Sequence, residues 1–180
     1  DLVRSRGLGD VYKRQFMYNL SYWSSWSNGF NIWKSEFDKI DKNLKLNKLF
    51  PHTSLFLTQH QAKLFCINDN LLFDVQRIPK RGGHNKFEAF TIEYPSLLDE
   101  CCKKGHISTK CKKHILFGIM VQFLPSLLFN KYIIRIETFD DTGFRDNLKK
   151  YYPSYAYWLV LISVLGVPFR LFCRKLKNKR

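Results

Sequence analysis

The sequence has few of the residues that mark several specialised protein classes. Its 180 residues include 5 cysteines, 9 glycines and 6 prolines, which excludes a disulfide-dense miniprotein and a collagen-like repeat. Hydrophobic residues make up 45% of the chain, too many for a disordered tail. Only one charge-free apolar stretch is long enough to approach a bilayer span, so we do not expect a channel or transporter built by this chain alone.

Common catalytic motifs are also missing. The sequence contains no Gly-x-Ser-x-Gly, no His-Glu-x-x-His and no glycine-rich phosphate loop. A catalytic nucleophile needs a base within hydrogen-bond reach, yet the 5 histidines are scattered along the chain. We therefore predict that the protein is not an enzyme.

Acidic residues are scarce as well. The chain has 15 Asp and Glu against 30 Lys and Arg, which gives a formal net charge of +15. After residue 15, however, Lys outnumbers Arg 19 to 7, whereas phosphate-binding surfaces favour the planar fork of Arg. The same part has three alanines and is rich in Phe, Ile, Asn and Lys, which is typical of an AT-rich coding sequence. We predict no nucleic-acid partner.

Residues 1–15 read Asp-Leu-Val-Arg-Ser-Arg-Gly-Leu-Gly-Asp-Val-Tyr-Lys-Arg-Gln, without a hydrophobic period or an initiator Met. This string resembles a translated sequencing adapter, so we treat it as a non-native artefact. We expect the protein's own sequence to start near Phe16 and to be truncated at its amino-terminal end.

Residues 16–150 are predicted to form one α+β domain built on an antiparallel β-meander. Turn residues at 68–70 and 81–85 separate the candidate strands, which are 54–58, 63–67, 71–78 and 86–94. Residues 115–129 are interpreted as a buried strand and loop, because Pro125 would break a helix there. A membrane hairpin is the alternative for that segment.

One or two helices are expected to pack on this sheet. Between Phe30 and Leu44 the apolar residues recur at steps of three and four, which predicts an amphipathic helix. A membrane-surface helix is the alternative interpretation of the same pattern. Short helices are also predicted at 96–104, stopped by Gly105, and at 142–152.

A transmembrane helix is predicted at residues 151–173. Residues 155–169 carry no charge, aromatic rings crowd the start, and six Lys and Arg lie at the end. A straight helix of this length measures about 35 Å, enough to span, with Trp158, Pro168 and Arg170 as anchoring residues.

Positive charge prefers the cytosolic side, so the basic tail, residues 174–180, is expected in the cytosol and the domain in the lumen or outside the cell. Asn19 is then a usable glycosylation acceptor. The competing topology keeps the domain in the cytosol.

The carboxyl-terminal region carries two further motifs. Asp141-Thr-Gly-Phe144-Arg145-Asp-Asn-Leu148 is followed by a segment that opens with Trp158-Leu159 and closes with Pro168-Phe169-Arg170. Both resemble the carboxyl end of the multipass transmembrane protein 151 family, where an Asp-x-x-Phe-Arg-x-x-Leu stretch precedes a last helix of the Trp-Leu to Pro-x-Arg pattern. The linker between the motifs is shorter here. The resemblance implies earlier membrane spans upstream and no enzymatic chemistry.

The densest group of reactive side chains lies between residues 101 and 114. A four-ligand zinc shell could be formed by Cys102, His106, Cys111 and His114, although their spacing matches no standard zinc motif. If the domain is lumenal, a disulfide from Cys101 or Cys102 to Cys111 is expected instead. The third interpretation is free cysteines beside a solvated basic loop. Cys173, at the membrane edge, is a candidate for palmitoylation.

These features predict a non-enzymatic fragment of an integral membrane protein, in the eukaryotic endomembrane system or the plasma membrane. Its role would be interaction or assembly, its partners the lipid bilayer and other membrane proteins, and no cofactor is expected. The alternative is a cytosolic-facing, tail-anchored domain that binds zinc through the Cys/His cluster and anionic partners through its basic surface.

Overall fold

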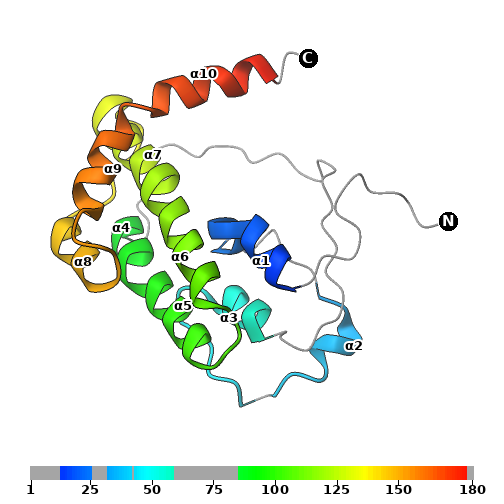
Figure 1. Cartoon of the computed structure of the whole chain (residues 1–180). Coiled ribbons are helices and arrows are strands. Elements are labelled where there is room, and N and C mark those ends of the chain that lie inside the picture. Colours follow the sequence, from blue (N-terminus) through cyan, green and yellow to red (C-terminus); the bar gives the residue numbers. More distant parts are fainter. Residues whose placement is uncertain (1–12, 26–31, 42, 59–84, 178–180) are drawn as a thin grey trace. The chain divides into compact units, whose positions relative to one another are not determined.

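The structure is a computed structural model that describes residues 13–25, 32–41, 43–58 and 85–177. Every regular element in this part of the chain is helical, and none is a strand (Figure 1). The predicted α+β fold is therefore wrong for the described residues. The predicted strands at 63–67 and 71–78 lie outside them. The chain divides into two compact units, residues 1–75 with 97–115 and residues 76–96 with 116–180.

Short helices of the first unit are held by buried hydroxyl contacts. α1 (Lys13–Leu20) leads into a 3-10 turn, η1 (Ser21–Ser25), and α3 (Pro51–Thr58) packs against that turn. Thr53 is fully buried and donates its hydroxyl to the Ser24 carbonyl over 2.8 Å. Since a buried hydroxyl needs a partner, this bond allows the polar face of α3 to be buried.

The predicted helix between Phe30 and Leu44 is wrong in extent. Within the described part of this segment only α2 (Lys34–Phe37) is helical. Further along, the Asp41 carboxylate accepts the backbone N–H of Asn43 over 2.9 Å. Such a local side-chain bond competes with the helical bonding of the backbone, which gives a physical reason for the early end.

Two predicted strands fall inside helices. Residues 54–58 belong to α3, and residues 86–94 form α4 (Lys86–Glu88), the π-turn η3 (Ala89–Glu93) and the first residue of α5 (Tyr94–Lys103). The alternating pattern of 90–94 coexists with a helical period, because Phe87, Thr91 and Tyr94 are all buried. Thr91 donates its hydroxyl to the Phe87 carbonyl over 2.7 Å, which allows a polar residue on that face.

The predicted helix at 96–104 and its stop are confirmed by α5. Gly105 has a φ of 74°, the His106 N–H donates to the Cys101 carbonyl, and the Gly105 N–H donates to the Cys102 carbonyl. This is the glycine-ended Schellman arrangement. The next helix, α6 (Thr109–Gly118), begins at once, because the Ser108 hydroxyl accepts the Cys111 N–H over 3.2 Å as an N-cap.

Residues 115–129 lie in a helix and not in the predicted strand and loop. α6, the π-turn η4 (Ile119–Phe123), α7 (Leu124–Leu128) and the π-turn η5 (Phe129–Ile133) form one helix of 25 residues. Pro125 lies in the first turn of α7, directly after the π-turn, where a missing N–H is tolerated. The helix ends before Arg135, whose φ of 60° is left-handed.

The core of the second unit joins these helices to the carboxyl-terminal segment. α8 (Phe144–Tyr151) confirms the helix predicted at 142–152 and contacts η3. The Phe87 ring lies 5.3 Å from that of Phe139 and 4.7 Å from that of Phe144, measured between ring centroids. α9 (Ala156–Val164) contacts η4 and α7, and both Ala156 and Val160 are buried.

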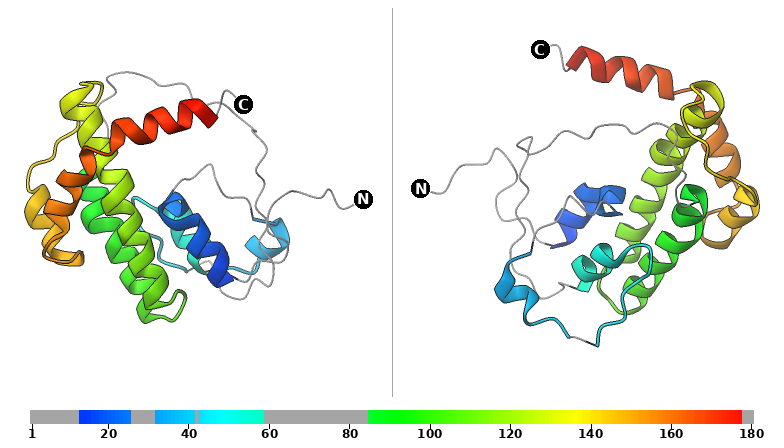
Figure 2. Two further views of the ribbon diagram at one scale, coloured as in Figure 1. Left: turned by 45° about the horizontal axis from the view of Figure 1, so that its top comes forward. Right: turned by 180° about the vertical axis from the view of Figure 1, so that it is seen from behind.

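Residues 151–173 do not form the single straight helix that was predicted, although residues 156–173 together are apolar enough for a broken membrane span or a re-entrant loop. Residues 152–154 follow α8 without helix, and α9 is separated from α10 (Val167–Lys177) by a bend of 51° (Figure 2). Pro168 explains the break, because it has no N–H to donate to the Val164 carbonyl and fits only the first turn of a new helix. At about 1.5 Å per residue the bent pair reaches about 20 Å from Ala156 to Cys173, short of a hydrocarbon core of about 30 Å.

Candidate functional site

The predicted zinc ligands are not brought together. Among the described residues, no three His, Cys, Asp or Glu side chains are grouped closely enough to hold a metal ion. Cys102 Sγ lies 3.5 Å from the Thr109 hydroxyl, and the His114 ring stacks on the Tyr18 ring with centroids 3.7 Å apart. Cys111 is buried, and the His106 backbone caps α5.

The modification candidates lie in different environments. Asn19 is exposed but lies within α1, whereas glycosylation acceptors favour surface loops. Cys101 and Cys111 are both buried and are not joined to each other by a disulfide. Cys173 is partly exposed on α10, so its lipidation stays a prediction.

One exposed apolar stripe follows α9 and α10, and it includes the predicted anchoring residue Trp158. Its members recur at steps of three and four, and more than half of each side chain is exposed: Tyr155, Trp158, Ile162, Leu165, Phe169, Phe172 and Leu176. We call these seven residues the exposed stripe. The opposite side of α9 carries the buried Ala156 and Val160. Because apolar patches of this kind are rare on soluble monomers, the exposed stripe is the main candidate for a functional surface.

Arg170, predicted as a membrane anchor, makes a hydrogen bond to the long helix that was not predicted. In a regular α-helix the N–H of residue 125 would donate to the Val121 carbonyl, but Pro125 has none. The Arg170 guanidinium donates to that carbonyl instead. Pro168, the third predicted anchor, lies exposed in the first turn of α10. Together these residues fix where α10 starts and how it meets the second unit's core.

The same device occurs a second time. Tyr94 N–H donates to Ala89 within the π-turn, and the next residue, Pro95, has no N–H to offer the Phe90 carbonyl. The Tyr152 hydroxyl donates to it over 2.7 Å. The sequence signal is a repeat of Pro-Ser-Leu-Leu at 95–98 and 125–128. In each copy a single residue separates the proline from the preceding π-turn. Sequence reasoning missed this repeat, although it is visible in the printed chain.

The helix at 109–133 is long and apolar enough to cross a membrane, and half of its most apolar window is buried inside the protein. Its neighbours argue for a core role. The Phe90 ring packs on Phe123 near the helix midpoint with centroids 4.1 Å apart, and Phe90 is bonded to Tyr152, which follows the charged α8. A span with this packing would carry charges into hydrocarbon at about 2.5–3.5 kcal/mol each.

The loop after the long helix is clamped by two lysines. Lys86 Nζ lies 3.0 Å from Glu137 Oε2, and Lys131 Nζ lies 2.6 Å from Asp141 Oδ1 and 2.8 Å from the Phe139 carbonyl oxygen. Both ammonium groups also face the Phe139 ring, at 5.1 and 5.8 Å from its centroid. This clamp closes the core beside Phe87.

Acid is expected to loosen this clamp. Burial raises the pKa of Asp141, but hydrogen bonds from Lys131 and Tyr132 outweigh it, so the pKa lies below its usual range. A lowered pKa stabilises the fold above the unfolded-state value of about 3.9, and this stability is lost as the pH falls through the folded-state pKa. Asp141→Asn should lower the free energy of unfolding by about 1.5–3 kcal/mol at pH 7 and by much less near pH 3.

Urea unfolding at the two pH values measures this effect. Asp146→Asn is the matched control, because Asp146 pairs with Lys149 on the exposed side of α8 and its loss should change little. Equal effects of the two substitutions would contradict the special role of Asp141.

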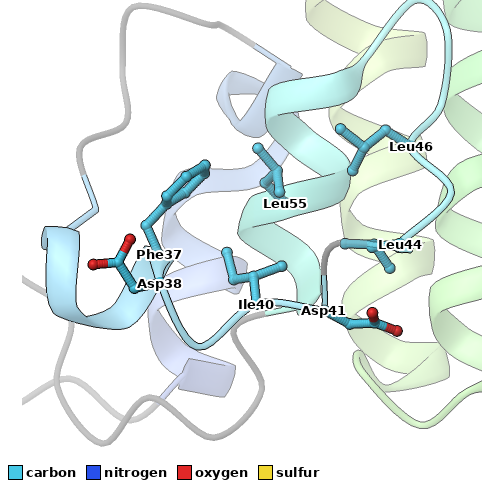
Figure 3. A pocket seen from close by; sticks show the side chains of 7 residues that line it. All are labelled: Phe37, Asp38, Ile40, Asp41, Leu44, Leu46 and Leu55. Atoms are coloured by element: carbon cyan, nitrogen blue, oxygen red, sulfur yellow. The ribbon is translucent and has the colours of Figure 1, made fainter.

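A pocket of about 380 Å³ opens in the first unit (Figure 3). It is lined by Phe37, Asp38, Ile40, Asp41, Leu44, Leu46 and Leu55. The Asp38 carboxylate points away from the apolar side chains, and Asp41 is engaged by the Asn43 backbone. The lining is therefore apolar, and it indicates no particular chemistry for a ligand.

Comparison with protein-family models, curated proteins and solved structures finds no match for this chain. The resemblance to the transmembrane protein 151 family stays a prediction that rests on residues 141–170.

Proposed function

We propose that this chain is a non-enzymatic, membrane-held module for interaction or assembly, in the endomembrane system or the plasma membrane. The exposed stripe of α9 and α10 is the observation that supports it. Inserting a half-exposed Leu, Ile or Phe into an apolar phase is worth about 1 kcal/mol, so seven such residues supply a useful anchoring energy.

The bilayer suits the exposed stripe better than a partner helix does. Steps of three and four also occur in coiled-coil seams, but the 51° bend interrupts this one between Leu165 and Phe169. Tyr155 and Trp158 at one end are residues that prefer the membrane–water interface. The bent pair would lie in one leaflet and hold the protein from one face, because the bend shortens its reach along any one direction.

Vesicle flotation tests the proposal. The purified full chain should rise with neutral phosphatidylcholine vesicles and remain bound in 1 M salt, because apolar insertion is insensitive to ionic strength. A chain that stays at the bottom of the gradient would contradict the proposal. If that chain instead elutes as a dimer by light scattering, the exposed stripe is an interface between two copies.

Sidedness gives a second test of the one-leaflet geometry. We would place one epitope in the loop between Asp140 and Gly143 and another after Arg180, and treat intact microsomes with protease. Both epitopes should be cleaved together or protected together. Protection of only one would mean that the bent pair crosses the bilayer.

A further inference from the structure

The carboxyl-terminal part of the chain is acid-free. No Asp or Glu occurs after Asp146, while eight Lys and Arg follow it up to residue 180. A surface of one charge sign attracts the opposite charge and repels like-charged partners.

The charge on α10 follows the same period as its apolar residues. Phe169, Phe172 and Leu176 are exposed, and cationic residues occupy positions 170, 174 and 177, one or two residues beyond these apolar positions. At 100° per residue, these cationic positions form a register adjoining the apolar one. This is the pattern of a helix that lies in the membrane plane with cations at the level of the headgroups.

The start of α10 is fixed by a contact of Arg170, the first cationic residue of this helix. Arg170 is engaged by the Val121 carbonyl, at the level of the first turn of α10. Positions 174 and 177 follow by one and two turns. The bend of 51° turns α10 away from the axis of α9 (Figure 2). With α9 inserted, α10 can therefore lie along the membrane surface.

We propose that α10 binds the headgroups of anionic phospholipids, through the cationic register at positions 174 and 177. This inference rests on the proposed membrane location, because the apolar face of α10 must be inserted for the register to meet headgroups. Each Lys or Arg near an anionic surface increases the affinity about fivefold.

The test compares vesicles of phosphatidylcholine alone with vesicles that contain phosphatidylserine. The full chain should bind the anionic vesicles at least tenfold more tightly at low salt, and the difference should shrink in 0.5 M salt because exposed charges are screened. The double variant Arg174→Gln/Lys177→Gln should lose about 30-fold in affinity for anionic vesicles and keep its affinity for neutral ones. The matched control, Lys149→Gln/Lys150→Gln, removes the same charge from the exposed side of α8 and should change the affinity far less.

The outcomes separate the two proposals. If the chain binds neutral vesicles but shows no anionic preference, the headgroup site is wrong and the membrane location stands. If both double variants lose affinity equally, net charge and not the α10 register attracts the lipid, which overturns the site. If no vesicle is bound at all, the membrane location itself fails.

Discussion

Replacing Leu165 with aspartate is expected to weaken vesicle binding by about 30- to 100-fold. Leu165 is 81% exposed at the bend between α9 and α10, the most exposed member of the stripe. A carboxylate there must be dehydrated on insertion, and the leucine's transfer energy is lost, which together cost about 2–3 kcal/mol. Because the side chain packs against little in the folded protein, the free energy of unfolding should not fall.

A matched control separates insertion from general polarity. Trp33 in the first unit is 82% exposed and apolar, so Trp33→Asp makes the same kind of change outside the stripe. Its vesicle affinity should stay within about twofold of the parent chain. Equal losses for Leu165→Asp and Trp33→Asp would show that the exposed stripe is not the membrane contact. The measurement is the partition coefficient from flotation, together with urea unfolding of each variant.

The largest loss of stability is expected for Phe87→Ala. Phe87 is 1% exposed, and its ring packs against Phe139 and Phe144, which come from the loop and from α8. Removing it leaves a cavity that three separate segments would have to close. The free energy of unfolding should fall by about 3–5 kcal/mol.

Phe117→Ala supplies the comparison for this substitution. Phe117 is 51% exposed on the long helix, so the same deletion of a ring should cost less than about 1 kcal/mol. Urea unfolding followed by circular dichroism measures both variants. A loss below 1 kcal/mol for Phe87→Ala would mean that the aromatic cluster does not hold the second unit together.

Helix ends were predictable because they depend on a few adjacent residues. Gly105 was predicted to stop a helix, and it does so with a left-handed φ of 74°. The helix at 142–152 was likewise found as α8. In both cases a single glycine next to an amphipathic pattern determines the local backbone, with no information needed from distant parts of the chain.

The strand predictions failed because a short alternating pattern does not distinguish a strand from a helix. Five residues around Phe90 alternate in polarity, yet the buried residues Phe87, Thr91 and Tyr94 follow a helical period over a longer window. Pro125 was interpreted as a helix breaker, but a π-turn and a side chain 45 residues later, Arg170, complete the bonding around it. The Pro-Ser-Leu-Leu repeat marks the two proline sites, but it does not identify the distant side chain that completes the bonding at each of them.

The candidate site was predictable in position but not in shape. Trp158, Pro168 and Arg170 do mark the segment that carries the exposed stripe, and the basic residues beyond it were recognised. The bend was not predicted, because hydropathy reports how apolar a segment is and not its direction. It is the bend that divides the predicted straight span into two short helices.

The two proline sites have a consequence for the order of folding. The carbonyls of Phe90 and Val121 receive their side-chain donors from Tyr152 and Arg170, which leave the ribosome about 50 to 60 residues later. Protein synthesis adds about 5–20 residues per second, so for several seconds the two carbonyl groups have only water as a substitute for these side-chain donors. A nascent chain halted before Tyr152 should therefore hold these helices only loosely, and it would offer their apolar faces to chaperones until synthesis has passed Arg170.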